Sequence, residues 1–148
     1  MQPDAKIDII ICDLSSLQSV QAAAKEFKSK NWPLHALILN AGLLFPDQKM
    51  TIDGLETTFA VNHVAHQYLV RELLPQLRES QARIVIVSSK SHNHTGLKPE
   101  MPLEEKLTKL CPTESTQFGY WLYAYSKLCN VLMGMRLHRE EHKNGISV

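Results

Sequence analysis

Three short apolar runs alternate along the chain with longer segments whose apolar residues recur at helical spacing. The runs cover residues 7–14 (IDIIICDL), 34–42 (LHALILNAG) and 83–89 (RIVIVSS). Short, β-branched apolar runs that end in polar or turn residues are typical of strands buried in a sheet. We therefore predict three strands at these positions.

The segments between these runs have the pattern of amphipathic helices. Residues 15–30 begin with a serine that can cap a helix, and residues 53–80 and 120–142 carry longer helical patterns. The stretch 90–118 has the pattern of a loop, and GISV at 145–148 predicts the start of a fourth strand. The chain therefore alternates strand and helix.

Such an alternation predicts the fold class. Continuous apolar strands joined by helices are typical of βαβ crossovers, in which helices cover both faces of a parallel sheet. We predict an α/β, doubly wound parallel sheet. No repeat, low-complexity tract or linker divides the sequence, so residues 1–148 are expected to form one unit.

Composition narrows the classes of function. Sixteen basic residues stand against 15 acidic ones, a net charge of +1, so nucleic acid is not an expected partner. The longest apolar run is too short to span a bilayer, and the first residues lack a signal-peptide pattern. The three cysteines are odd in number and widely spaced, which favours reduced thiols and a cytoplasmic location over a disulfide frame.

The stretch WLYAYSKLCN at 121–130 carries candidate chemistry. Helix residues four apart share a face, whereas residues two apart point about 200° away from each other. Tyr123 can therefore face Lys127, and Tyr125 cannot. An ammonium one turn away favours the ionised form of a phenol and makes it a usable acid or base. Tyr-x-x-x-Lys also arises by chance in aromatic-rich helices, so the motif needs support from other residues.

Further polar and small residues fall where an open parallel sheet places its site, at the carboxyl ends of the strands. They are Asp13 and Leu14 after the first strand, Asn40, Ala41 and Gly42 after the second, and Ser88 and Ser89 after the third. Glycine lets a ligand approach the backbone closely, and a serine hydroxyl can donate to a carbonyl oxygen. Asn62 lies inside the second helix, where its amide is expected to be solvated or bonded locally.

Taken in order, DL at 13, NAG at 40, VNH at 61, VSS at 87 and YAYSK at 123 resemble the short-chain dehydrogenase/reductase family over nearly the whole chain. The resemblance implies a Rossmann-like fold and NADP- or NAD-dependent oxidoreduction of a carbonyl or secondary alcohol, with a steroid or retinoid as the substrate class by analogy.

The resemblance also implies roles for single residues. Tyr123 would be the general acid, Lys127 would support it and hold the nicotinamide ribose, Ser89 would orient the carbonyl, and Asn62 would help to hold a water. Asp13 and Leu14 would lie near the adenine. Asn40, Ala41 and Gly42 would line the floor of the cofactor site.

The family's first strand, Gly-rich phosphate turn and second strand would precede residues 7–14, and its substrate region would follow 145–148. Neither is present in the sequence, so we expect a sheet that is incomplete at both ends and a weakened cofactor grip. In the family's sheet, two strands separate the one matching 7–14 from the one matching 34–42. The run at 7–14 is thus expected to lack its neighbours and to expose its apolar face.

Two alternatives stay open. One alignment with the family places the alanine and tyrosine at 124 and 125 at the catalytic position, which would make Tyr125 the acid. The chain could also be a non-catalytic interaction or regulatory product with protein partners. The histidine pairs show no third ligand, so no metal site is predicted.

Overall fold

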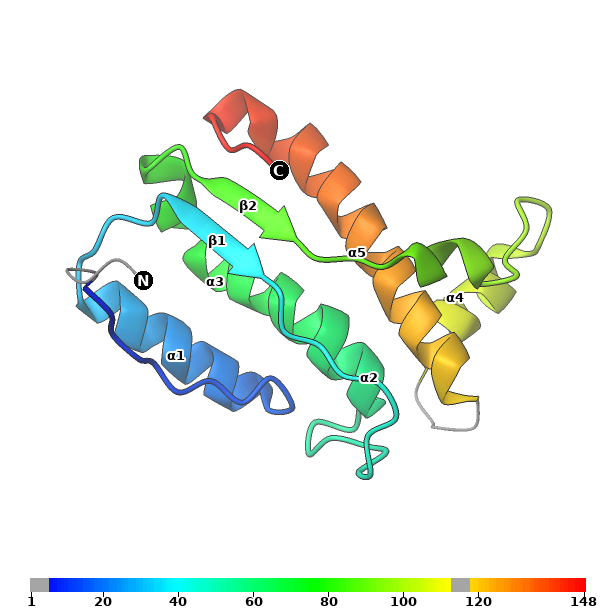
Figure 1. Cartoon of the computed structure of the whole chain (residues 1–148). Helices are drawn as coiled ribbons and strands as arrows, with labels where there is room; N and C mark the ends of the chain where they lie inside the picture. The colour runs from blue at the N-terminus through cyan, green and yellow to red at the C-terminus, as the bar shows by residue number, and fades with distance from the viewer. Residues whose placement is uncertain (1–5, 113–117) are drawn as a thin grey trace.

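The computed structural model describes residues 6–112 and 118–148, and its centre is a short parallel sheet (Figure 1). Strand β1 (Ala36–Leu39) pairs with β2 (Arg83–Ile86), with Ala36 opposite Arg83 and Leu39 opposite Ile86. Both strands lie inside predicted runs, and the parallel pairing confirms the α/β class. The last residues begin a further strand, because Ser147 forms a parallel bridge with Arg83.

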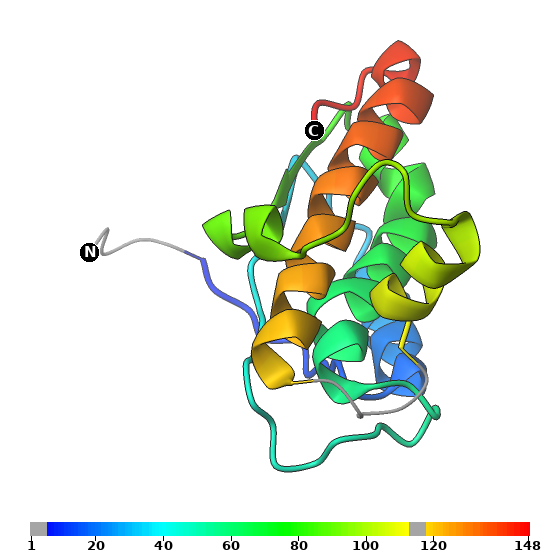
Figure 2. The ribbon, with the colours of Figure 1, turned by 90° about the vertical axis from the view of Figure 1, so that its right-hand side faces the viewer.

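Three long helices lie side by side and cover one face of this sheet (Figures 1 and 2). They are α1 (Leu17–Ser29), α3 (Ala65–Glu79) and α5 (Gly119–Glu141). Ser16 caps α1 by accepting a hydrogen bond from the Ser19 amide, as the sequence predicts. The core lies between the helices and the inner face of the strands. Its fully buried members include Leu39, Val70, Leu77, Ile84 and Ile146.

The prediction that helices cover both faces of the sheet is wrong for the described residues. Alternate strand residues point away from the helices, and Ile38 is 65% exposed and Val85 40% exposed. Neighbouring side chains of a strand point to opposite faces, so one face of each strand is buried and the other is open.

The predicted strand at 7–14 is also not formed. Residues 6–12 have no regular structure, and Ile7, Ile9 and Ile11 are 84%, 74% and 81% exposed. A strand needs a hydrogen-bonded neighbour, and this run has none among the described residues. The run is rich in β-branched residues, as a strand would be, but the sheet of the described residues begins with β1.

The helix predicted at 53–80 forms in three consecutive pieces. The short α2 (Thr57–Phe59) leads into the π-helix η1 (Ala60–Val64) and then α3. The helix starts later than predicted because Glu56 caps it, accepting hydrogen bonds from the amides of Thr58 and Phe59 at 2.9 and 2.8 Å. A π-turn inside a helix is uncommon and is frequently found at functional sites.

The loop predicted at 90–118 is wrong in part, because it contains the 3₁₀ helix η2 (Lys90–His94) and helix α4 (Leu103–Leu110). The eight residues of α4 carry a leucine at every third or fourth position, and Glu104 and Glu105 favour its amino end. Leu103 and Leu107 are exposed, and no residue of α4 is buried. The helix therefore lies at the surface and is not part of the core.

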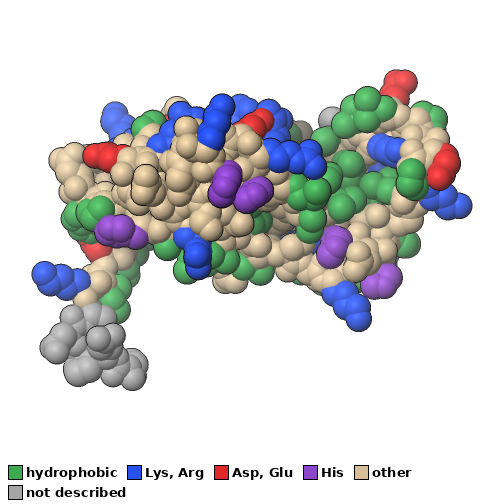
Figure 3. All heavy atoms as spheres, turned by 90° about the horizontal axis from the view of Figure 1, so that it is seen from above, with side chains coloured by type: hydrophobic (Ala, Val, Ile, Leu, Met, Phe, Trp, Pro, Cys, Tyr) green, Lys and Arg blue, Asp and Glu red, His purple; other side chains and the backbone are tan. Residues whose placement is uncertain are grey.

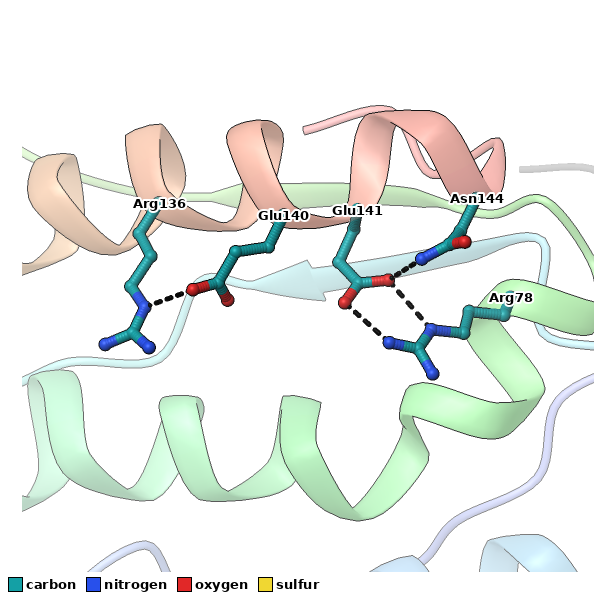
Figure 4. A network of polar contacts seen from close by, with 5 residues as sticks. All are labelled: Arg78, Arg136, Glu140, Glu141 and Asn144. Atoms are coloured by element: carbon teal, nitrogen blue, oxygen red, sulfur yellow. Dashed lines mark hydrogen bonds and ion pairs between the residues drawn. The ribbon is translucent and has the colours of Figure 1, made fainter.

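A polar clamp joins the ends of α3 and α5 (Figure 4). Nε and Nη2 of Arg78 donate to the Glu141 carboxylate at 2.8 and 2.7 Å. Asn144, in the short 3₁₀ helix η3 (His142–Asn144), donates a third hydrogen bond to the same carboxylate at 2.8 Å. These hydrogen bonds hold the pKa of Glu141 at about 2. Arg136 and Glu140 form a neighbouring but exposed pair.

Candidate active site

Tyr123 and Lys127 lie one turn apart on α5, and the Lys127 ammonium lies 5.5 Å from the centre of the Tyr123 ring. Tyr125 lies on another side of the helix. Its buried side chain lines a pocket of about 420 Å³, together with Thr95, Met101 and Trp121. The structure thus brings together the pair expected from helical spacing.

Lys127 is buried at the carboxyl end of β2. Its Nζ donates to the Val87 carbonyl oxygen at 3.1 Å, and burial lowers the pKa of its ammonium. The Ser88 hydroxyl donates to the Lys127 carbonyl at 2.8 Å, which ties the strand end to α5. An ammonium has three donors, so the Val87 bond leaves others available to a ligand.

Asn62 lies in the π-turn and is completely buried. Its side-chain oxygen accepts from the Leu43 amide at 2.8 Å, and its nitrogen donates to the Leu43 carbonyl and to Ser126 Oγ, both at 3.0 Å. The two bonds to Leu43 fix the backbone directly after Gly42. The amide is neither solvated nor bonded only within its helix, so that expectation is wrong: the π-turn directs it toward the strand end.

Gly42 meets these side chains with no room to spare. A β-carbon on Gly42 would lie 3.1 Å from Asn62 Oδ1 and 3.4 Å from Lys127 Nζ. The contact with Asn62 would therefore be tight for any residue with a β-carbon, and the contact with Lys127 would be an ordinary one. Asn40 and Ala41, which precede it, are exposed at the end of β1.

Sequence reasoning missed Asn130, which connects the parts of this site. Its side-chain nitrogen donates to the carbonyls of Asn62 and Val87 at 3.0 and 3.3 Å, and its oxygen lies 3.1 Å from His63 Nδ1. The sequence does place this polar residue one turn after Ser126 in a largely apolar helix, which could have indicated a buried polar contact.

A second residue missed from the sequence is His66, one turn beyond Asn62 in α3 and buried. Burial, and next the charge of Lys127, lower its pKa to about 4. His66 is therefore neutral at pH 7, so Lys127 carries the positive charge at this point of the core.

A family model described as short chain dehydrogenase matches residues 1–98. The chain belongs to the short-chain dehydrogenase family. It is 42% identical to the WW domain-containing oxidoreductase of Pongo abelii over 144 residues, which is 97% of this chain and 34% of that protein. The chain thus spans about a third of the length of such curated relatives.

Solved structures of short-chain dehydrogenases share the fold. A short-chain dehydrogenase from Streptomyces avermitilis has a TM-score of 0.67 and 21% identity, covering 99% of this chain and 47% of that one. A metagenomic short-chain oxidoreductase in complex with NADP has a TM-score of 0.66 and 19% identity, covering 97% and 56%. At these identities the likeness establishes the Rossmann-type fold alone.

Within this short-chain dehydrogenase fold, Ser89 lies beyond β2 and caps η2. Its hydroxyl oxygen accepts from the Ser91 amide at 3.3 Å and from the Ser91 hydroxyl at 2.9 Å. Both bonds use Ser89 as the acceptor, so its own hydroxyl hydrogen remains free to donate. η2 also packs against α5, the helix of Tyr123.

Asp13 and Leu14 stand apart from this cluster. The Asp13 carboxylate accepts from the amide and hydroxyl of Ser15 at 2.9 and 2.7 Å, and these bonds lower its pKa. Within residues 6–112 and 118–148, neither residue bonds to Gly42, Asn62 or Lys127. The strand that would carry Asp13 to the sheet edge is the one that does not form.

The described residues contain no group of three or more His, Cys, Asp or Glu placed to hold a metal ion. Figure 3 shows histidine side chains at several separate places on one face, and the rings of His138 and His142 lie 5.0 Å apart. No helix in the described part of the chain is long and apolar enough to cross a bilayer.

Proposed function

We propose that these residues form the catalytic side of an NADP- or NAD-dependent oxidoreductase that interconverts a carbonyl and a secondary alcohol. The observation that carries the proposal is the placement of the Lys127 ammonium over the Tyr123 ring, beside Gly42 and Asn62 at the strand ends. Side chains in this arrangement can move a proton at a substrate oxygen.

Each residue would have a separate task. Tyr123 gives its phenolic proton to the carbonyl oxygen, and the adjacent Lys127 charge stabilises the phenolate that remains. Ser89 donates its free hydroxyl hydrogen to the same oxygen and orients the carbonyl. Asn62 and Asn130 hold the backbone around a water that resupplies the proton.

The nicotinamide end of a dinucleotide fits the described residues, because Gly42 is exposed at the strand end and lies close to Lys127, whose ammonium has further donors. Asn40 and Ala41 would continue that floor. When bound, the dinucleotide supplies or accepts the hydride. The pyrophosphate does not fit: the six glycines of the sequence are scattered singly, and none forms a Gly-rich turn between a strand and a helix.

We further propose that the chain is the middle part of a dehydrogenase domain, and that the phosphate grip and the substrate-closing region belong to flanking sequence. Asp13 and Leu14 would then reach the adenine once strand 7–14 is paired. By analogy with the family, the substrate is a lipophilic alcohol or ketone such as a steroid or retinoid. The free cysteines support a cytoplasmic setting, which fluorescence microscopy of a tagged chain tests.

The test is a completed domain in which the first βαβ unit and the C-terminal region of a close relative are joined to this chain. We expect it to oxidise or reduce a secondary alcohol or ketone with a nicotinamide dinucleotide. Replacing Tyr123 by Phe should remove that activity and leave nucleotide affinity intact. Full activity of the Tyr123→Phe domain would refute the assignment.

A second candidate function is a non-catalytic interaction product, and the exposed Ile7, Ile9 and Ile11 favour it. Calorimetric titration of the 148-residue chain alone separates the two. Without a phosphate turn, we expect no dinucleotide binding tighter than about millimolar, which is about −4 kcal/mol. A micromolar constant would favour catalysis by the chain itself.

A further inference from the structure

The carboxyl end of α4 rests on α5 at a pair of cysteines. The Cys129 sulfur is buried on α5 and donates a weak hydrogen bond to the carbonyl oxygen of Leu110 at 3.9 Å. That carbonyl belongs to the peptide group that joins Leu110 to Cys111. The two sulfur-bearing residues are therefore separated by a single peptide plane.

Covalent geometry bounds the distance between them. Across a planar trans peptide, a carbonyl oxygen and the next Cα lie about 3 Å apart, so Cys129 Sγ lies within about 7 Å of the Cys111 Cα. A disulfide joins Cα atoms about 4.4 to 6.8 Å apart, and the Cys129 Cα lies beyond its sulfur, so the two Cα atoms must approach each other before the bond can form. Cys111 is the exposed C-terminal cap of a short, largely exposed helix, and this helix end is the part that would move toward Cys129.

The two thiols differ in access and in acidity. Burial, and next the neighbouring Cys111, raise the pKa of Cys129 to about 12, and partial desolvation of the Cys111 sulfur raises the pKa of Cys111 although the residue as a whole is exposed. Cys111 is exposed and Cys129 is buried. A soluble oxidant therefore meets Cys111 first, and Cys129 is placed to react second.

We propose that Cys111 and Cys129 form a reversible disulfide that tethers α4 to α5 when the chain meets a peroxide. The Cys111 thiolate attacks one peroxide oxygen, the O–O bond breaks, and hydroxide leaves to give a sulfenic acid. Cys129 then attacks the Cys111 sulfur: the S–S bond forms, the S–O bond breaks, and the thiol proton leaves with hydroxide as water. Two thiols lose two electrons and two protons, and the peroxide becomes two waters.

The tether would act on the helix that carries Tyr123 and Lys127. Met101, Lys109, Trp121 and Tyr125 line a pocket between α4 and α5. The tether would prevent the two helices from separating and so would keep this pocket from widening. This inference concerns the covalent state of the chain and stands independently of the proposed oxidoreductase activity.

Peptide mapping tests the disulfide. The purified chain is treated with hydrogen peroxide, free thiols are blocked with N-ethylmaleimide, and the protein is digested with trypsin without reduction. Cleavage after Lys109, Lys127 and Arg136 places Cys111 and Cys129 on separate peptides. We expect peptide 110–127 joined to peptide 128–136, with only Cys12 blocked and the link lost on adding dithiothreitol.

Matched variants make the result decisive. Cys12→Ser should keep the link, and Cys111→Ser, which changes an exposed residue and leaves the core intact, should abolish it. With a glutathione redox buffer, the disulfide should form at least about tenfold more favourably in native buffer than in concentrated urea, because the fold holds the thiols together. Three blocked thiols after oxidation, links involving Cys12, or equal formation in urea would each overturn the proposal.

Discussion

The Lys127 ammonium lies over the ring of Tyr123, and both side chains come from successive turns of α5. Tyr125, only two residues on, is buried and lines a pocket that Trp121 and Met101 also line. The helix therefore gives two nearly adjacent tyrosines different surroundings, and substitution of each can separate their roles.

The first prediction compares these tyrosines in the completed domain. Tyr123→Phe removes only a phenolic oxygen, so carbonyl reduction should fall by about two to four orders of magnitude, the range for losing a general acid, with cofactor affinity unchanged. Tyr125→Phe should stay within about a few-fold of the parent. Steady-state kinetics with both substrates measures this. An inactive Tyr125→Phe variant together with an active Tyr123→Phe variant would support the alternative alignment, in which Tyr125 is the general acid.

The second prediction concerns the close approach of Gly42. Gly42→Ala inserts a methyl group 3.1 Å from Asn62 Oδ1, and both oxygen and ammonium are held by other bonds. We expect a loss of about 1 to 2 kcal/mol in the free energy of unfolding, measured by urea denaturation.

Gly134→Ala is the control for that substitution. Gly134 lies inside helix α5, and its new methyl group would lie 3.6 Å from Ile86, an ordinary contact. It should be neutral or add about 0.5 to 1 kcal/mol through helix propensity. Equal effects at the two glycines would show that the Gly42 contact is not tight.

The third prediction uses Asn130. Asn130→Ala removes the side-chain donor to the Asn62 and Val87 carbonyls, and the Val87 carbonyl keeps the Lys127 ammonium as a donor. The expected loss is about 1 to 3 kcal/mol, since the buried Asn62 carbonyl loses its side-chain donor. The exposed Asn93→Ala should change stability by less than about 0.5 kcal/mol. If Asn130→Ala behaves like Asn93→Ala in urea denaturation, Asn130 does not connect the site.

The fourth prediction is a pH dependence of the Arg78–Glu141 clamp. The folded pKa of Glu141 is about 2, below the ordinary value of 4.5, so the clamp's contribution is complete above about pH 4.5 and is lost as the pH falls toward 2. Because Arg78 is half exposed and solvent weakens its attraction, we expect the clamp to add about 2 kcal/mol to the free energy of unfolding, less than the pKa difference alone would give.

Unfolding of Glu141→Gln across this range provides the measurement. The variant should be less stable than the parent at pH 7 and nearly equal to it near pH 2. Glu140→Gln, which breaks the exposed neighbouring pair with Arg136, should differ by less than about 0.5 kcal/mol at every pH. A pH-independent difference for Glu141→Gln would exclude its carboxylate as the cause.

Sequence patterns predicted features that depend on local geometry. The facing of Tyr123 and Lys127 follows from helical spacing, and the cap at Ser16 from its position before an apolar stripe. Residues 7–14 have strand periodicity, but pairing depends on a neighbour that a local pattern cannot supply. The bonds of Asn62 and Asn130 join η1, α5 and two strand ends, so no single segment encodes them. The π-turn that aims Asn62 has no signature in hydrophobic spacing.

The unpaired run at residues 7–11 affects the self-association of the purified chain. Its three exposed isoleucines, and the open face at Ile38 and Val85, present apolar surface on a run without a paired strand among the described residues. Such surfaces join copies edge to edge, and the process accelerates with concentration. Stock solutions of the isolated chain should therefore turn turbid on storage unless kept dilute, and charged residues at positions 7 and 9 should extend their shelf life.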